Sequence, residues 1–145
     1  MWVREIRIVY GKRLPTEGPM LNLKNASQVA ALMGPVMELE VVEVCYALLL
    51  TTKTGLIRYC EVSRGGISMT LVHPREVFQI ALLANAASVV LVHNHPSGDP
   101  TPSQDDFAIT HRVKEAGNVI GVELLDHVIL GHAGRYASIK ELGRL

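Results

Sequence analysis

The chain has 145 residues, enough for one domain with a core of its own, and its 14 lysines and arginines balance its 14 aspartates and glutamates. The zero formal charge excludes a global basic field that would draw the protein to nucleic acid or to an anionic membrane, so only a local patch could bind nucleic acid. Although 48% of the residues are apolar, no apolar run reaches the length of about 18 residues that a membrane span needs, so we expect no membrane partner.

The N-terminal part of the chain predicts an edge strand followed by a loop. Residues 3–10 alternate charged and apolar positions, which is typical of a half-buried strand at a sheet edge, and such an edge would allow a homo-oligomer. Prolines and glycines then break regular structure as far as residue 25. Charges interrupt the apolar core that a signal peptide needs, so we expect a cytoplasmic protein. From the length of the chain, we expect residues 1–145 to form a single domain.

The next segment predicts a helix and a set of strands. In chain order, we expect a short helix that begins after Asn25 and is interrupted or ended at Gly34-Pro35, a strand over 41–50, a strand over 56–62 and a short strand over 67–72. The first strand is apolar apart from Glu43, which is typical of a buried central strand. Cys45 and Cys60 lie in these runs, and we expect buried, reduced thiols because disulfides are unusual in the cytoplasm.

The second half of the chain alternates strands and helices. In chain order, we expect a helix from Pro74, a strand over 88–92, a helix over 103–116 ended by Gly117, strands over 122–125 and 128–130, a turn over 131–134, a strand over 136–138 and a final stub of helix. A proline at the first helical position and a glycine after the last one are typical helix boundaries. The pattern predicts an α/β fold, a sandwich around one mixed β-sheet.

Histidines and carboxylates cluster directly after the strand over 88–92. His93 and His95 are two residues apart on an extended segment, so their imidazoles can face one ion from the same side. Asp106 lies three residues after Ser103, in the first turn of the next helix, and supplies a carboxylate. Two imidazole nitrogens, one carboxylate oxygen and an open fourth position are typical of a catalytic zinc, whereas a structural zinc has four protein ligands. The sequence therefore predicts one Zn²⁺ per chain.

Each part of this cluster also has a purely structural explanation. Ser103 and Asp106 match a capping box, and a His-x-His pair is a weak signal by itself. Asp99 and Asp105 are the alternative ligands, but Asp99 suits the turn in which it lies, and Asp105 points away from its neighbour on the helix toward solvent. His127 is expected to pack, or to support a ligand, rather than to bind metal itself.

A zinc hydrolase also needs a base that accepts a proton from the attacking water, and glutamate is the usual residue. Glu43 is an isolated acid at the head of an apolar strand, a position suited to proton transfer. Glu76 competes for this role, although an acid in the first turn of a helix needs no catalytic explanation, and Glu61 ranks third. From the residues alone, the choice stays open.

The spacing His93-x-His95, seven residues, Ser103, two residues, Asp106 resembles the signature of the JAMM/MPN+ metalloproteases, which contain a JAB domain. Residues 43–50 resemble the strand that carries the catalytic glutamate of that family, which favours Glu43 over Glu76. Within the superfamily, the segments at 73–77, 85–86, 93–100 and 126–127 are similar to the RadC-like branch.

The resemblance implies an MPN/JAB fold, a three-layer-like and cytidine-deaminase-like sandwich with a central mixed sheet. It implies zinc held by His93, His95 and Asp106 with water as the fourth ligand, Glu43 acting on that water, and Ser103 stabilising the tetrahedral intermediate. The implied function is a zinc-dependent hydrolase, a metallopeptidase or isopeptidase whose partner is a protein or peptide substrate.

Two features of related proteins have no counterpart in this sequence. RadC-like proteins usually carry an N-terminal helix-hairpin-helix region associated with DNA, and we expect no separate domain of that kind within residues 1–145. JAMM deubiquitinases carry insertions that grip ubiquitin, and no segment resembles them, so the substrate is not implied. The alternative function is a non-catalytic or DNA-associated module that retains the metal site, which salt-sensitive binding to DNA would identify.

Overall fold

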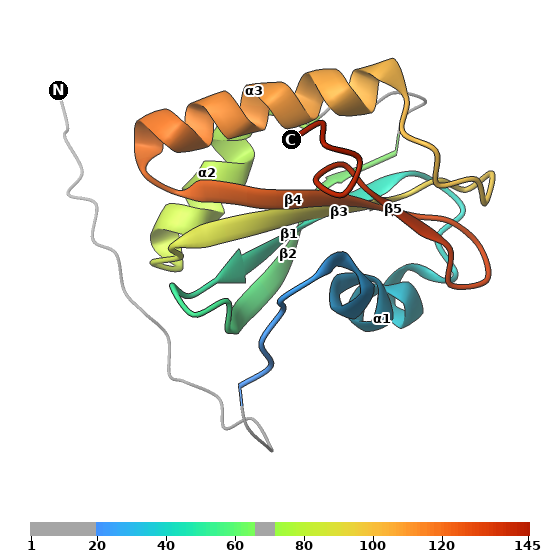
Figure 1. The fold of residues 1–145 in the computed structure, drawn as a ribbon, viewed down its shortest axis with the longest axis horizontal. Coiled ribbons are helices and arrows are strands. Elements are labelled where there is room, and N and C mark those ends of the chain that lie inside the picture. Colours follow the sequence, from blue (N-terminus) through green and yellow to red (C-terminus); the bar gives the residue numbers. More distant parts are fainter. Residues whose placement is uncertain (1–19, 66–71) are drawn as a thin grey trace, which may run out of the picture.

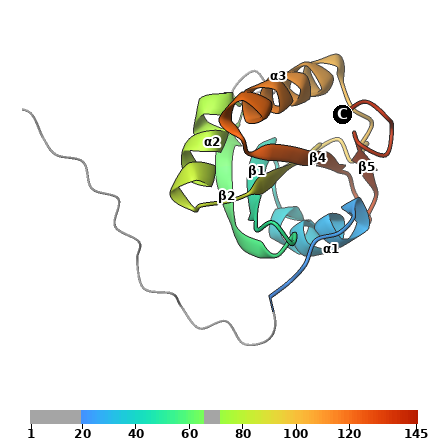
Figure 2. The ribbon, with the colours of Figure 1, turned by 60° about the vertical axis from the view of Figure 1, so that its left-hand side comes forward.

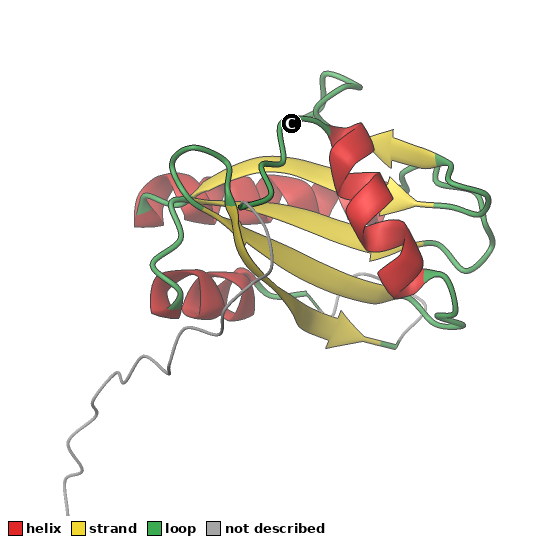
Figure 3. Cartoon of the chain, turned by 90° about the horizontal axis from the view of Figure 1, so that it is seen from below, coloured by secondary structure: helices red, strands yellow, loops and turns green. Residues whose placement is uncertain are grey.

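The computed structural model describes residues 20–65 and 72–145, which form three layers. A β-sheet lies at the centre, with α1 on one face and α2 and α3 on the other (Figures 1 and 2). Seen from below, α1 crosses the strands obliquely in front of the sheet (Figure 3). The α/β sandwich around a mixed sheet that the sequence predicts is confirmed.

Within the described ranges the sheet has five strands in the order β2-β1-β3-β4-β5. β1 (Val44–Leu50) pairs antiparallel with β2 (Leu56–Arg64) and with β3 (Ser88–Asn94), β3 pairs parallel with β4 (Glu123–Leu130), and β5 (Tyr136–Ser138) pairs antiparallel with β4. The central strands β1 and β3 are buried on both faces, which explains their nearly continuous apolar sequences. The parallel pair β3 and β4 is joined by a crossover helix, as parallel strands require.

The helices of the described ranges are α1 (Ala26–Met37), α2 (Pro74–Leu83) and α3 (Gln104–Ile120). Each begins at a side chain that accepts a hydrogen bond from a free backbone N–H of the first turn: Asn25 for α1, His73 for α2 and Ser103 for α3. The predicted starts of all three helices are confirmed.

The prediction that Gly34-Pro35 interrupts or ends the first helix is wrong, because α1 continues through Pro35 to Met37. A proline inside a helix removes one backbone hydrogen bond and crowds the preceding turn. Here the helix still packs beyond Pro35: Met37 lies one turn beyond Met33, and the side chains of both methionines are buried against the sheet. Burial of Met37 offsets the cost of the proline.

The prediction that Gly117 ends the third helix is also wrong, because α3 continues to Ile120. The residue that leaves the helix in the left-handed conformation is Gly121, with φ of 84°. A Cβ atom on Gly117 would lie 2.4 Å from the carbonyl oxygen of Val122 and 3.0 Å from Cζ of Phe78. Gly117 therefore permits close packing and does not form a turn.

β4 is a single strand and not the two strands predicted over 122–125 and 128–130. Where β3 passes from Val89 to Val90, the paired residues of β4 skip Leu125, which is an extra residue in the strand. A bulge of this kind breaks the alternation of side chains between the two faces. As a result, Leu124 and His127 both face α2 and α3, which strict alternation would forbid.

The predicted stub of helix at the C-terminus is wrong, since residues 139–143 form turns. The backbone N–H groups of Lys140 and Glu141 bond to the side chains of Asp126 and Ser138 instead of to helical carbonyls. The strand at 136–138 is confirmed.

Other predictions concern the cysteines, and segments outside the described residues. Cys45 is buried and Cys60 is half-buried, and both are free thiols as predicted. The strand predicted over 3–10 lies outside the described residues, as does the strand over 67–72 except for Val72. No helix in the described ranges is both long and apolar enough to cross a bilayer.

Candidate metal centre

The ends of two central elements bring the predicted ligands together. His93 is the second-last residue of β3, and His95 directly follows the strand. In β3 the even-numbered residues face α1 and the odd-numbered residues face α3. Asp106 is the third residue of α3, the helix that crosses back over the same face. Because the crossover from β3 returns over the sheet, the first turn of α3 lies above the end of the strand.

The three side chains converge on one point. One atom from each of His93, His95 and Asp106 lies within 4.8 Å of the others, a grouping that could hold a metal ion. The Nε2 atoms of the two histidines are 3.0 Å apart, and the carboxylate oxygens of Asp106 lie 3.1 Å from Nε2 of His93 and 3.4 Å from Nε2 of His95. His93 and Asp106 are buried, and His95 is half-buried, so the cluster opens to the surface on the His95 side.

The capping box and the metal cluster share Asp106 without conflict. Oδ2 of Asp106 accepts from the backbone N–H and from the hydroxyl of Ser103, at 2.7 and 2.8 Å, while Oγ of Ser103 accepts from the backbone N–H of Asp106. Oδ1 is buried and has no hydrogen-bond partner among the described residues. One oxygen therefore satisfies the helix, and the other is left for a cation, because a buried acceptor without a partner is costly.

The charges of the cluster also suit a cation. Burial raises the pKa of Asp106, but the neighbouring rings of His93 and His95 and the backbone of Ser103 lower it by more, so this pKa lies well below its usual range. The interaction with Asp106 raises the pKa of His95, and burial opposes this effect only in part. The buried carboxylate of Asp106 is therefore ionised and supplies the negative charge that a cation needs.

Glu43 lies next to this cluster, directly before β1. Cys45 of β1 pairs with His93 of β3, and continuing this antiparallel register places Glu43 opposite His95. The charge of Glu43 is one of those that raise the pKa of His95, whereas neither Glu76 nor Glu61 is among them.

Asn94 fixes the backbone on both sides of Glu43, a role that our sequence reasoning missed. Its Oδ1 accepts from the backbone N–H of Val44 at 2.8 Å, and its Nδ2 donates to the carbonyl of Val42 at 3.0 Å. Its place between His93 and His95, pointing to the opposite face, was the only signal in the sequence. The segment 93–95 thus carries two candidate ligands, His93 and His95, and the residue that holds the backbone around the candidate base Glu43.

The other candidates have separate structural roles. Asp99 accepts from the backbone N–H and the hydroxyl of Thr101, which stabilises the turn as predicted. Asp105 is exposed on α3, and Glu76 is exposed in the first turn of α2. Glu61 is bound by Arg64. His127 touches His93 and is not part of the metal-ligating group.

A groove of about 540 Å³ runs beside His95. It lies between the C-terminal half of α1, the segment at 94–96 and the turn at 130–135. Its lining is mostly apolar, and Glu38, Glu40 and Arg135 are its acidic and basic residues. Arg135 and His132 hold the turn against the carbonyl of Gly98. The open side of the metal cluster therefore faces a groove.

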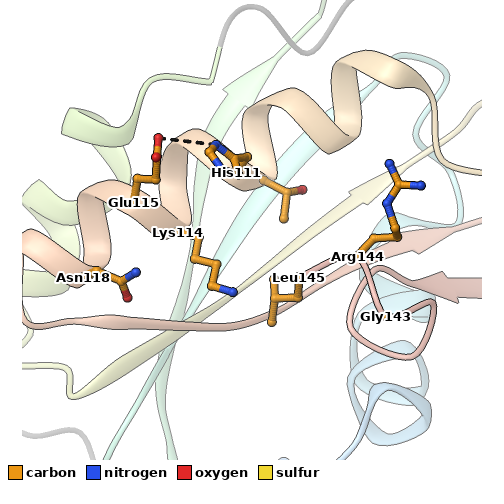
Figure 4. A pocket seen from close by; sticks show the side chains of 8 residues that line it. His111, Lys114, Glu115, Asn118, Gly143, Arg144 and Leu145 are labelled. Carbon is orange, nitrogen blue, oxygen red and sulfur yellow. Dashed lines mark ion pairs between the residues drawn. The ribbon is translucent and has the colours of Figure 1, made fainter.

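A second hollow lies beside α3, between the helix and the C-terminal residues (Figure 4). His111 and Glu115, which line it, form an ion pair with each other. None of the three candidate ligands lines this hollow, and we assign it no part in the site.

A family model described as the RadC-like JAB domain matches residues 23–144. The chain belongs to this family. Relatives of this RadC-like JAB domain carry the name UPF0758 protein. One from Methanococcoides burtonii is 44% identical over 88% of the chain and 56% of its own length. One from Clostridium beijerinckii is 47% identical over 77% of the chain and 48% of its own length. Another, from Pelobacter propionicus, is 55% identical over 68% of the chain and 42% of its own length. The chain thus spans about half the length of the curated relatives it matches.

Proposed function

We propose that this domain is a zinc-dependent hydrolase that cleaves an amide bond in a protein or peptide, as a metallopeptidase or isopeptidase in the cytoplasm. The observation that carries the proposal is the convergence of His93, His95 and Asp106 within 4.8 Å at the mouth of a groove, with Glu43 opposite His95 in the strand register. A metal site that served only to stabilise the fold would not need an open side or an adjacent acid.

The donor set fits zinc. Two imidazole nitrogens and one carboxylate oxygen are a common catalytic ligand set for this ion, and the partnerless Oδ1 of Asp106 provides an acceptor that a cation would satisfy. When bound by His93, His95 and Asp106, zinc supplies Lewis-acid polarisation of a carbonyl and lowers the pKa of water toward neutrality. His127 and Ser103 hold two of the three ligands in place from behind.

Glu43 is the proposed general base and, later, the general acid. It accepts one proton from water as the water oxygen forms a bond to the amide carbon, and it returns that proton to the nitrogen as the carbon–nitrogen bond breaks. The products are a carboxylic acid and an amine, and Glu43 ends in its starting form. The hydrogen bonds of Asn94 to Val42 and Val44 keep the Glu43 backbone beside the cluster.

Ser103 is the proposed donor to the oxyanion. Its hydroxyl donates to Oδ2 of Asp106, and the residue itself is exposed, so rotation toward a substrate exchanges one hydrogen bond for another. The backbone N–H of Ser103 keeps its own bond to Asp106 during this rotation. The groove beside His95 is the proposed seat of the substrate chain.

Glu43→Gln tests the assignment, with Glu76→Gln as its matched control. Zinc-loaded protein and both variants are assayed on a library of linear peptides and isopeptide-linked conjugates, and zinc content is measured in parallel. We expect Glu43→Gln to keep its zinc and to lose turnover by about 10²–10⁴-fold, the usual contribution of a general base, and Glu76→Gln to match the parent. If Glu43→Gln cleaved as fast as the parent, the proposed role of Glu43 would be wrong.

A further inference from the structure

Behind His93, away from the groove, a chain of hydrogen bonds joins two of the candidate ligands through the interior. Nδ1 of His93 lies 2.8 Å from Nε2 of His127, and Nδ1 of His127 lies 2.6 Å from Oγ1 of Thr110. Oγ1 of Thr110 lies 2.6 Å from the backbone carbonyl oxygen of Asp106, four residues earlier on α3. All four residues are at most 1% exposed, so water does not compete for these bonds.

The bulge in β4 creates this chain of bonds. If Leu125 were paired in a regular strand without a bulge, strict alternation from Leu124 would turn His127 to the α1 face, away from His93. The bulge turns His127 toward α3, where Thr110 lies. A local irregularity in the strand is thus what brings an imidazole behind the candidate ligand.

The carbonyl end of the chain fixes the direction of every hydrogen in it. A carbonyl oxygen can only accept, so the single hydroxyl hydrogen of Thr110 points to Asp106. Oγ1 of Thr110 must then accept from Nδ1–H of His127. An imidazole that carries its hydrogen at Nδ1 has a lone pair at Nε2, and Nε2 of His127 faces Nδ1 of His93.

That lone pair accepts a hydrogen from His93. Nδ1 of His93 is therefore protonated, and its Nε2 presents a lone pair toward His95 and Asp106. The opposite order would leave Oγ1 of Thr110 and the carbonyl oxygen of Asp106 at 2.6 Å with no hydrogen between them, where two acceptors repel.

We propose that Thr110 and His127 are positioning residues that set the tautomer and the ring orientation of His93, so that its Nε2 is ready for a metal ion before the ion arrives. The inference rests on the proposed metal site. Ligating histidines usually donate their second N–H to a carboxylate, a backbone carbonyl or water. In this domain His127 takes that place. Thr110 holds His127 in one tautomer, because the hydroxyl hydrogen of Thr110 is donated to the backbone of α3.

The first test needs no variant. Long-range ¹⁵N–¹H correlation spectra of the metal-free full chain, at mildly alkaline pH where imidazoles are neutral, report which ring nitrogen carries hydrogen. We expect His93 and His127 both to be protonated at Nδ1. A His93 ring protonated at Nε2 with a bare Nδ1 would overturn the proposal, whether or not the protein binds zinc.

The second test compares Thr110→Val, which has the same shape without the hydroxyl, with Thr110→Ser, which keeps the hydroxyl. Zinc affinity is measured by competition with a chelator, and circular dichroism verifies the fold. We expect Thr110→Val to bind zinc about 10–100-fold more weakly, the usual cost of losing such a partner, and Thr110→Ser to stay close to the parent. Equal affinities of folded Val and Ser variants would overturn the positioning role of Thr110.

These results separate the inference from the proposed function on which it rests. A parent protein that bound no zinc would contradict the proposed metal site, and the positioning role would fall with it. A parent that bound zinc normally but carried the other His93 tautomer when metal-free would contradict the inference alone.

Discussion

Asn94→Ala should damage both the stability and the activity of this domain, because the side chain of Asn94 joins parts of the chain that are fifty residues apart. Its amide accepts from Val44 at 2.8 Å and donates to Val42 at 3.0 Å, and Val44 is fully buried. The alanine variant leaves the N–H of Val44 without a partner, which costs about 1–3 kcal/mol, and removes a second bond worth about 0.5–1.5 kcal/mol.

We therefore expect Asn94→Ala to lower the free energy of unfolding by about 2–4 kcal/mol, and Tm by about 5–15 °C for a domain of this size. Urea denaturation measures the first quantity, and the m value should not change, since the native surface is nearly the same. Asn118→Ala is the matched control: Asn118 is exposed on α3, so the same substitution should leave stability within about 0.5 kcal/mol of the parent.

The functional part of the prediction concerns Glu43, whose flanking residues Asn94 holds. In folded Asn94→Ala, measured well below its Tm, turnover should fall by a larger factor than zinc affinity, because the base is loosened while the three ligands remain. A variant as stable as the parent would refute the hydrogen-bond reasoning. A destabilised variant with the parent's turnover would refute the claim that Asn94 positions Glu43.

Three further predictions concern metal, pH and packing. At a free zinc concentration 100-fold above Kd, bound metal should add about 2.7 kcal/mol to the free energy of unfolding and raise Tm by about 5–11 °C, measured by thermal denaturation. A chelator should abolish this gain, and His95→Ala should not show it. Because Asp106 raises the pKa of His95, protons should compete with zinc for this ring at pH values up to and above the ordinary histidine pKa. Zinc affinity measured by calorimetry should therefore increase as pH rises through the raised pKa of His95 and then level off. A zinc affinity independent of pH from mildly acidic to alkaline conditions would contradict this prediction. Gly117→Ala should lower the free energy of unfolding by about 1–3 kcal/mol, because its Cβ would clash with the carbonyl oxygen of Val122. Gly34→Ala has open space around its Cβ in α1 and should raise the free energy of unfolding by about 0.5–1 kcal/mol. Urea midpoints in the reverse order would refute the packing analysis.

The sequence predicted the main architecture because its signals are local. The apolar runs marked β1 and β3. Asn25, Pro74 at a first helical position and the capping box of Ser103 marked where the helices begin. The grouping of two histidines and a carboxylate could also be predicted, since a two-residue spacing on a strand and a capping box each fix the direction of a side chain. In both cases a few neighbouring residues carry the information.

What the sequence did not predict depends on contacts between distant residues. The bulge at Leu125 follows from the pairing of β4 with β3, and the continuation of α1 through Pro35 follows from the burial of Met37 on the sheet. Asn94 and Thr110 are ordinary polar residues until the fold brings them beside Val44 and His127. Tertiary packing decided each of these, and no local rule applies to them.

The central claim is that His93, His95 and Asp106 hold a single ion, and the metal content of the purified chain tests it most directly. The protein is incubated with zinc, freed of unbound metal and analysed by elemental mass spectrometry, beside His95→Ala, Asp106→Ala and the exposed control Asp105→Ala. We expect one equivalent of zinc in the parent and in the control, and none in the two ligand variants. No zinc in the parent, or one equivalent that persists in both ligand variants, would contradict the claim.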